Sequence, residues 1–573
     1  MRLPWKRRPD EGYILVMVSI LMVVMLVFAA LVIDVSMLYS RGNKLQAAAD
    51  AAALAGVQYM PGNLTRARTA ALDAAKANGF DGTDPNVTIT VTAVAGSPRR
   101  LNVEIRDAAV KTVFGGAVRP SFAVRRDATS EYVPSIPVGS PVNELGYGPD
   151  QNFWLAVNGY CTAKEDGDQY LAGFDGTRDN TGSYGCNSGP QPLANTDYNN
   201  KRSGASSVPS TKGGYSYLVH VPCTSGGTSD PTIPCDSTDR TTAPVTIQMF
   251  DPWFNPGLPD SPDVIPNPGC SDPSSAWFET CGVTTIVQVY PPDTTPSDYS
   301  DDVAVFSPAR RYSPDGCACS TAAWTDLYTI PVGSQTGSWR VQVYTLDRER
   351  RSASGSGYNS FGVNAFSLRA FRGGTYSTCN ASIDATCVGV SGDAAMSLFA
   401  QAPTASAEFY LARLSPASEF RGKQVRVSLW DPGEGGQSIQ IVEPGVPLNQ
   451  ASVTGYPFVA RLGSPGLNGY SADSSAYSYT GRVLDVTGAP EPSSGFNVSG
   501  TARANPTKFN GRLVELTLTI PANYGLDGSG NEAALPDDGW WRIRYNFGAG
   551  TVRDRTTWSV KLVGDPVHLV PGG

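Results

Sequence analysis

Hydrophobic residues are concentrated near one end of the chain. Residues 13–33 form an uncharged, almost wholly apolar run that follows Arg2, Lys6, Arg7 and Arg8. As a helix, these 21 residues are long enough to cross a hydrocarbon core of roughly 30 Å. Basic residues ahead of a span favour retention of the N-terminus in the cytoplasm. The pattern therefore predicts a single-pass protein of the cytoplasmic membrane, with residues 1–12 inside and residues 34–573 outside.

A cleaved signal peptide is the alternative interpretation of the same run. Its apolar region would be about 7–15 residues long and would be followed by a small-x-small cleavage site. The run here is longer, and Ala29-Ala30 lies within it rather than after it. These features favour an uncleaved anchor.

After the apolar run, the chain keeps a helical pattern but loses its hydrophobicity. Small residues recur at four-residue spacing in two rows, which are Ala47, Ala51, Ala55 and Ala48, Ala52, Gly56. Such rows allow a helix to approach another backbone closely, although they also reflect the helix propensity of alanine. A second helix is predicted over 64–78 and strands over 87–94 and 101–106. A short helix with Phe-Gly-Gly at 114–116 and a last strand over 121–132 complete a predicted α+β module.

The sequences Val-Ile-Asp-Val-Ser-Met-Leu-Tyr (32–39) and Lys-Leu-Gln-Ala-Ala-Ala-Asp-Ala-Ala-Ala-Leu-Ala-Gly (44–56) carry a resemblance. Together with the span, they look like the N-terminal signature of TadG-like proteins of Flp-type (tight-adherence) pilus assembly. The resemblance is close over residues 12–60 and looser to about 132. It implies a single-span envelope protein, with its bulk outside the cytoplasmic membrane, that takes part in pilus or secretion-type assembly and has no enzymatic activity.

Two departures limit what this resemblance implies. Some relatives carry a von Willebrand A-type metal site with an Asp-x-Ser-x-Ser motif. The segment Asp34-Val-Ser36-Met-Leu38 begins in that way but lacks the second serine, so no metal site is expected there. Prepilin-like relatives have a glutamate at the fifth position after their cut point. A cut at Gly12 would place Met17 at that position, which argues against processing as a pilin.

Beyond residue 133, short alternating segments between clusters of turn residues predict an all-β region. A stretch of this length suggests at least two domains. A weak duplication supports two, because 217–221, 245–252, 339–344 and 361–370 resemble 410–414, 425–432, 541–545 and 558–563 in the same order. The fold class is therefore mixed: a transmembrane helix with a small α+β module, then all-β tandem sandwich or jelly-roll-like domains. The predicted segments are 1–12 (tail), 13–33 (span), 34–132 (α+β module), 133–149 (linker), 150–372 (first β domain) and 373–573 (second β domain).

All ten cysteines lie between 161 and 387, in the region predicted to be exported. An even number in such a region indicates disulfides formed in an oxidising compartment. Proximity in the chain predicts the pairs Cys161–Cys186, Cys223–Cys235, Cys270–Cys281 and Cys379–Cys387. The partners of Cys317 and Cys319 stay open. A zinc site is disfavoured because there is one closely spaced thiol pair and the two histidines, His220 and His568, are far apart in the chain.

The sequence contains no catalytic motif, and its two histidines nearly exclude a His-based triad. We therefore expect a protein that is not an enzyme and that needs no cofactor, although a glycosidase using carboxylates alone stays open. Acidic turns offer oxygen ligands for a Ca²⁺ site, and the candidate ligands are Asp166, Asp168, Asp527, Ser529, Asn531 and Asp538. The ordinary interpretation of such turns is that they are solvated.

A net charge of −8 and a pI of about 5.1 argue against nucleic acid as a partner. The chain is rich in aromatic residues, including Trp253, Trp277, Trp540 and Trp541, and aromatics at loop tips can stack on sugars. Two functions are therefore predicted. The first is a structural or accessory component of Flp-type pilus assembly or surface attachment, with other pilus-assembly or envelope proteins as partners. The alternative is a membrane-anchored adhesin that binds a surface glycan.

Overall fold

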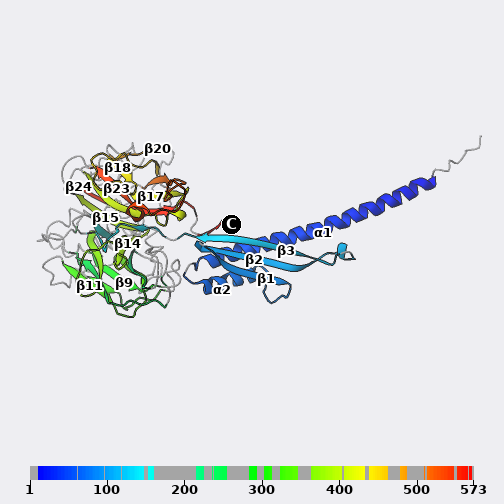
Figure 1. Ribbon diagram of the computed structural model, residues 1–573, viewed down its shortest axis with the longest axis horizontal. Helices are drawn as coiled ribbons and strands as arrows, with labels where there is room; N and C mark the ends of the chain where they lie inside the picture. Colours follow the sequence, from blue (N-terminus) through cyan, green and yellow to red (C-terminus); the bar gives the residue numbers. More distant parts are fainter. Residues whose placement is uncertain are drawn as a thin grey trace, which may run out of the picture. The chain divides into compact units, whose positions relative to one another are not determined.

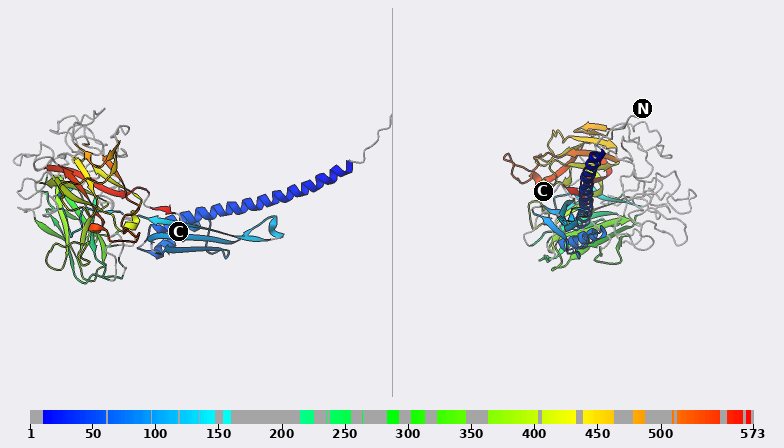
Figure 2. Two further views of the ribbon diagram at one scale, coloured as in Figure 1. Left: turned by 45° about the horizontal axis from the view of Figure 1, so that its top comes forward. Right: turned by 90° about the vertical axis from the view of Figure 1, so that its right-hand side faces the viewer.

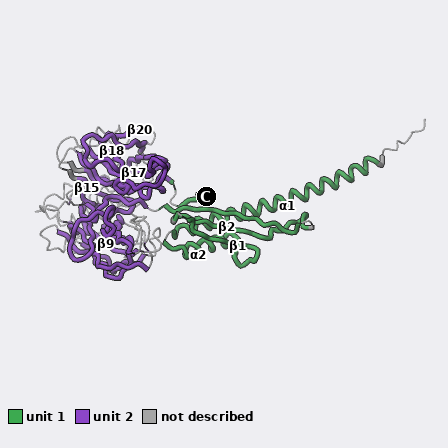
Figure 3. The backbone as a smooth tube through the Cα atoms, in the orientation of Figure 1, with its two compact units in different colours: residues 1–133, 564–573 green, residues 134–563 purple. Residues whose placement is uncertain are grey.

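In the described part of the chain, a long helix is combined with three antiparallel sheets, and the predicted fold class is confirmed. The computed structural model describes residues 11–60, 62–95, 97–117, 119–133, 135–146, 153–159, 214–224, 235, 238–254, 263, 283–292, 302–312, 323–345, 363–402, 406–432, 438–462, 478–486, 509, 513–546, 552–564 and 567–570. The chain divides into two compact units, residues 1–133 with 564–573 and residues 134–563 (Figure 1; Figure 3).

Unit 1 is built on helix α1, Glu11–Val57. Its other elements are α2 (Leu64–Ala77), β1 (Val87–Val94), β2 (Ser97–Lys111), the 3₁₀ turn η1 (Gly115–Ala117), β3 (Ser121–Tyr132) and β25 (Val567–Val570). The sheet has the order β1-β2-β3-β25, so the strand nearest the end of the chain pairs with β3. The N-terminal part of α1 projects beyond the sheet, and the β2–β3 hairpin runs beside the helix (Figure 2).

Local sequence explains where α2 begins and ends. Asn63 caps its first turn, because the side chain accepts a hydrogen bond from the Arg66 backbone N–H at 2.8 Å. At the other end, Gly79 adopts a positive φ of 87°, a conformation that glycine reaches without strain. Between these ends, Ala67, Ala71 and Ala75 are buried on one face. The helix predicted over 64–78 is therefore present with nearly the same bounds.

The C-terminal half of α1 forms the core of unit 1. Ala48, Ala52 and Gly56 are fully or almost fully buried in this core. A Cβ added to Gly56 would lie 2.7 Å from the Ala67 carbonyl oxygen, so a glycine is needed where α1 meets α2. One of the two rows of small residues therefore does allow close approach, whereas Ala47 in the other row is exposed.

Unit 2 contains a ten-stranded and an eleven-stranded sheet among its described residues. The first sheet has the order β10-β9-β12-β7-β14-β4-β16-β23-β18-β21. The second has the order β11-β8-β13-β6-β15-β24-β17-β22-β19-β20, and its eleventh strand, β5, pairs with β13 outside this order. The strands of the first half are β4 (Pro137–Val138), β5 (Glu144–Leu145), β6 (Phe153–Asn158), β7 (Tyr215–Val221), β8 (Val245–Phe250), β9 (Thr285–Tyr290), β10 (Arg310–Tyr312), β11 (Trp324–Ile330), β12 (Gly337–Thr345) and β13 (Val363–Arg372). Those of the second half are β14 (Gly389–Asp393), β15 (Ala395–Ala402), β16 (Ser406–Arg413), β17 (Gln424–Trp430), β18 (Ser438–Val442), β19 (Phe458–Leu462), β20 (Ser478–Gly481), β21 (Leu484–Asp485), β22 (Leu513–Thr519), β23 (Trp540–Asn546) and β24 (Val552–Leu562).

Each half of unit 2 has the strand order of a jelly roll. In the first half, β6-β13-β8-β11 face β7-β12-β9-β10, and in the second half β15-β24-β17-β22 face β16-β23-β18-β21. These eight strands of each half can be numbered 1 to 8 along the chain. In both halves, one sheet then has the order 1-8-3-6 and the facing sheet has the order 2-7-4-5. The hairpin β19–β20 is an addition to the second half. The sequence pairs that suggested duplication fall on equivalent strands: β7 with β16, β8 with β17, β12 with β23 and β13 with β24.

The two jelly rolls are joined by exchanged strands. The short strand β4 of the first copy pairs with β16 of the second copy, and β14 of the second copy pairs with β7 of the first. In the other sheet, β6 pairs directly with β15. The buried residues of both copies belong to one continuous hydrophobic cluster.

The segment predicted as a linker, 133–149, therefore has a different role in its described part. Val138 and Leu145 are fully buried, and β5 pairs with β13 through Leu145 and Leu368. Proline and glycine punctuate this segment because it changes direction between two short strands, not because it is solvated. The other division, predicted at 372/373, falls between β13 and β14, whereas residues 564–573 belong to unit 1.

Candidate functional site

The strongest candidate for a functional region is α1 together with the hairpin beside it. Within the part of the chain that the structure describes, α1 is the helix that is long and apolar enough to cross a membrane. Its apolar residues between 13 and 33 are not covered by the protein; Leu15 and Phe28, for example, keep 71% and 64% of their surface exposed. A soluble protein rarely leaves such a surface in water, so this part of α1 needs an apolar environment.

Asp34, the first residue after the apolar run, fastens the β2–β3 hairpin to the helix. Its Oδ1 accepts the backbone N–H of Val113 at 2.7 Å, and its Oδ2 accepts that of Gly115 at 2.6 Å. The N–H of Phe114 lies 3.2 Å from both oxygens. Burial acts to raise the pKa of the Asp34 carboxyl, but the hydrogen bonds from Gly115, Val113 and Phe114 outweigh it and hold the pKa below its ordinary value of 3.8. The carboxylate therefore stays charged, and the contact intact, at neutral pH.

The polar positions of the alanine-rich segment connect α1 to the sheet. The Gln46 side chain donates to Asp50 Oδ1 at 2.8 Å and to the Asp127 carbonyl on β3 at 3.1 Å. The buried Ser130 hydroxyl donates to the Ala53 carbonyl at 2.7 Å. The fixed polar residues that made this segment recognisable thus set the register between α1 and β3.

One ion pair lies between Asp34 and the alanine-rich segment. Arg41 donates through Nε to Asp107 Oδ2 at 2.9 Å, and its guanidinium stacks 4.4 Å from the centre of the Phe80 ring. Asp107 lies on β2, so the helix is fixed to both strands of the hairpin. Sequence reasoning did not identify these contacts. The available signals were an acid directly after an apolar run and a Gly-Gly pair able to present backbone N–H groups.

Two of the four proposed disulfides lie among the described residues, and both are formed. Cys223–Cys235 and Cys379–Cys387 have Cα–Cα distances of 5.4 and 5.8 Å. The proposed pairs Cys161–Cys186 and Cys270–Cys281, as well as Cys317 and Cys319, lie outside the described residues.

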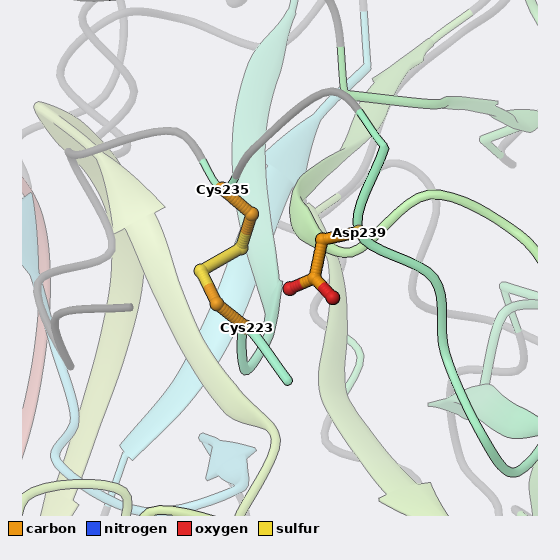
Figure 4. A group of neighbouring side chains, drawn as sticks. All are labelled: Cys223, Cys235 and Asp239. Carbon is orange, nitrogen blue, oxygen red and sulfur yellow. A yellow bond between two sulfur atoms is a disulfide. The ribbon is translucent and has the colours of Figure 1, made fainter. Parts of the chain in front are cut away.

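Asp239 approaches the Cys223–Cys235 bridge closely enough to resemble a metal centre (Figure 4). Both sulfur atoms are used in the disulfide, so neither is a thiolate ligand. The Asp239 carboxylate instead accepts hydrogen bonds from the Thr224 backbone N–H, at 2.6 Å, and from the Thr224 hydroxyl. These hydrogen bonds and the disulfide hold the chain segment that follows β7.

The structure separates the calcium candidates near the second jelly roll. Asp527, Ser529 and Asn531 share one turn, in which Asp527 Oδ1 accepts the backbone N–H groups of Ser529 and Asn531 at 2.8 and 2.9 Å. These hydrogen bonds, that of Asn531 first, lower the pKa of Asp527. Asp538 instead forms an ion pair with Arg413 at 2.9 Å. Asp166 and Asp168 lie outside the described residues.

A groove of about 520 Å³ lies in unit 2 beside this turn. Tyr410 lines it together with Glu532, Asp537 and Asp538. All three carboxylates are engaged: Glu532 by Arg421 at 2.6 Å, Asp537 by the Gly445 N–H at 2.9 Å, and Asp538 by Arg413. The groove is therefore polar and already hydrogen-bonded.

Tryptophans in the described part of unit 2 mostly belong to its core. Trp339, Trp430, Trp540, Trp541 and Trp558 are all buried, and Trp253 is partly buried against the core. Trp277 lies outside the described residues. The aromatic richness of the sequence is thus largely a property of packing between the two sheets.

One known protein family matches the part of the sequence that forms α1. Residues 12–58 match a family model described as "Putative Flp pilus-assembly TadE/G-like". The matched region ends one residue after α1 and contains Asp34, Arg41, Gln46 and Asp50. No curated protein and no solved structure matches the chain.

Proposed function

We propose that this protein is a membrane-anchored, non-enzymatic structural component of Flp-type pilus assembly. The observation that carries the proposal is the coincidence of the TadE/G-like match at 12–58 with a helix whose first half is apolar and uncovered and whose second half organises a folded module. The family match and the apolar helix fit a membrane-anchored, pilus-associated protein.

In the proposed orientation, residues 1–12 lie in the cytoplasm, residues 13–33 span the membrane and residues 34–573 lie outside. The basic residues ahead of the span support this orientation. The two disulfides among the described residues of unit 2 also support it, because such bonds persist in oxidising compartments.

Protease added to intact spheroplasts tests the orientation. The region after the span, residues 34–573, should be digested, leaving a protected fragment of a few dozen N-terminal residues. A tag at residue 1 should be cut only after lysis. Protection of a tag at the C-terminus in intact spheroplasts would show that the orientation is reversed.

The role in assembly rests on contacts made by α1 and its module with other envelope proteins. The test is to delete the gene, count surface pili, and restore either the full chain or a chain in which residues 13–33 are replaced by an unrelated apolar span of equal length. The full chain should restore piliation. Restoration by both chains would assign the assembly contacts to the folded units, and normal piliation without the gene would refute the role.

The groove beside Tyr410 favours one alternative, which is attachment to a surface glycan through unit 2. Tyr410 offers an aromatic face beside polar groups, a combination that suits sugars. Glycan-array binding by the full chain, reduced by Tyr410→Ala but not by Tyr479→Ala on the outer hairpin, would support this alternative. Equal binding by both variants would remove the groove from consideration.

A further inference from the structure

The tip of the β2–β3 hairpin exposes two adjacent apolar side chains. β2 ends at Lys111 and β3 begins at Ser121. Between them, Val113 and Phe114 keep 58% and 56% of their surface exposed. A Val-Phe pair on the tip of a turn is unusual, because exposed turns are normally built from polar residues and glycine.

The position of this tip is set by Asp34. The Asp34 carboxylate binds the backbone of residues 113–115, and it directly follows the apolar run 13–33. A Cβ added to Gly115 would lie 3.0 Å from Asp34 Oδ2, so the turn fits closely around the carboxylate. Wherever the apolar run ends at a membrane surface, the tip is therefore held at the same level.

Basic residues flank the apolar pair. Lys111 and Arg119 are exposed on the two sides of the turn, and the Arg119 guanidinium lies 4.4 Å from the centre of the Phe122 ring. The turn itself is closed by a hydrogen bond from the Thr112 hydroxyl to the Arg119 carbonyl at 2.8 Å. Apolar side chains between cations match the chemistry of a phospholipid interface, where acyl chains lie beneath anionic phosphates.

We propose that residues 112–116 form a second membrane contact, in which Val113 and Phe114 insert into the interfacial region of the leaflet from which α1 emerges. This inference rests on the proposed function, since it requires α1 to span the membrane. The partner is the lipid surface itself, chosen because the tip is continuous with the span and carries phosphate-compatible charge. Two contacts on one rigid module restrict rotation of α1 about its axis and its tilt in the bilayer.

Photo-crosslinking in a bilayer tests this contact. The full-length chain would be reconstituted in nanodiscs of phosphatidylethanolamine and phosphatidylglycerol, with p-benzoylphenylalanine at one position at a time, and lipid adducts measured by mass spectrometry. Position 26 reports on the span and position 114 on the tip. Position 95, exposed in the β1–β2 turn at the far end of β2, is the matched control.

Adducts at 26 and 114, with at least fivefold fewer at 95, are the expected result. Adducts at 26 without adducts at 114 would overturn the inference and leave the membrane anchor intact. An absence of adducts at 26 would overturn the anchor itself, and the inference with it. In native membranes, adducts of position 114 with a protein in place of lipid would also overturn it.

Two variants sharpen the assignment. Asp34→Ala removes the acceptor that holds the tip and should lower the adduct yield at 114 several-fold, with position 26 unchanged. Val113→Asn replaces the exposed apolar side chain by a neutral polar one while keeping the backbone N–H that binds Asp34, and it should lower the yield at 114 at least fivefold. A yield at 114 that neither variant changes would show that the tip is not inserted through its apolar pair.

Discussion

The two jelly rolls of unit 2 keep the same strand order but close the same connection by different means. In the first copy, the connection from β7 to β8 runs from Val221 to Val245 and carries the Cys223–Cys235 bridge. In the second copy, the equivalent connection from β16 to β17 runs only from Arg413 to Gln424. There the Leu414 N–H donates to the Gly539 carbonyl at 2.8 Å, and Arg421 pairs with Glu532.

This difference follows from the length of the connection. A longer loop loses more conformational entropy when it is ordered, and a covalent link offsets part of that loss by restricting the unfolded chain. A short loop can be ordered by a few hydrogen bonds. The duplicated fold thus tolerates loops of different length as long as each loop has a means of closure suited to it.

The polar outer face of the two equivalent sheets differs as well. On β12, Arg340 pairs with Asp302 and lies over the Tyr290 ring at 4.0 Å. On β23, the equivalent Arg542 shares the buried Glu408 with Arg544. In the first copy, one arginine side chain is therefore bound by a carboxylate and an aromatic ring. In the second copy, two arginine side chains share one carboxylate.

The largest loss of stability is expected from core substitutions, which test whether the two jelly rolls unfold together or independently. Phe366 and Trp558 lie on the equivalent strands β13 and β24, and both are fully buried. Replacing either by alanine should cost about 3–5 kcal/mol. Because the sheets and core are continuous, both variants should lower one common thermal transition, measured by calorimetry on the full chain.

Two separable transitions, each lowered by only one of the variants, would show that the copies unfold independently. The double variant should then leave both transitions at the single-variant temperatures. In a shared unfolding unit, the double variant should instead lose about 6–10 kcal/mol, which is comparable to the whole stability of many domains.

The next largest loss of stability is expected from the buried ion pairs. Glu408→Gln leaves Arg542 and Arg544 without their anion and should cost about 3–5 kcal/mol, measured by denaturant unfolding. Asp302→Asn should cost less, because the Tyr290 ring still faces Arg340. An equal or larger loss for Asp302→Asn would contradict the view that the second copy depends more on its carboxylate.

The disulfide should have an intermediate effect. Replacing both Cys223 and Cys235 by alanine should lower stability by about 2–4 kcal/mol, with the native fold retained. Glu532→Gln, which removes the ion pair at the equivalent connection, is the matched control and should cause a smaller shift in melting temperature because both side chains reach solvent. A larger shift for Glu532→Gln would reverse the proposed division between covalent and polar closure.

The smallest effect is expected from removing divalent cations. Asp527 already accepts two backbone N–H groups and Asp538 is paired with Arg413, so a chelator should leave the melting temperature unchanged. A clear decrease with EGTA, reversed by Ca²⁺ and absent in Asp527→Asn, would instead establish calcium at this turn.

Much of the fold could be predicted from sequence where patterns are local. The apolar run, the helix at 64–78 and the alternating strands were visible because hydrophobic periodicity reports directly on which face is buried. The duplication was visible because equivalent strands such as β8 and β17 end in the same aromatic-Asp-Pro sequence, in which Asp251 and Asp431 both adopt positive φ. Such signals need no knowledge of distant partners.

The features that sequence did not predict depend on pairing between distant segments. Pro137 and Val138 form too short a strand to produce a periodic pattern, and nothing local shows that they pair across the two copies. Likewise, Val567–Val570 could have joined any sheet edge. Asp34 was recognised as the end of the apolar run, but its partners lie about 80 residues away, in a turn whose contribution is backbone N–H groups rather than side chains.

The pairing of β25 with β3 also has a consequence for the order of events during synthesis. The edge of β3 at Thr129–Tyr132 lacks its partner strand until residues 567–570 have been made. At roughly 5–20 residues per second, the 434 residues between these strands take about 20–90 s to synthesise. During this time, the sheet of unit 1 lacks β25 while both jelly rolls are synthesised. A chain whose synthesis stops before residue 567 would therefore keep an open strand edge at β3 that chaperones or proteases could recognise.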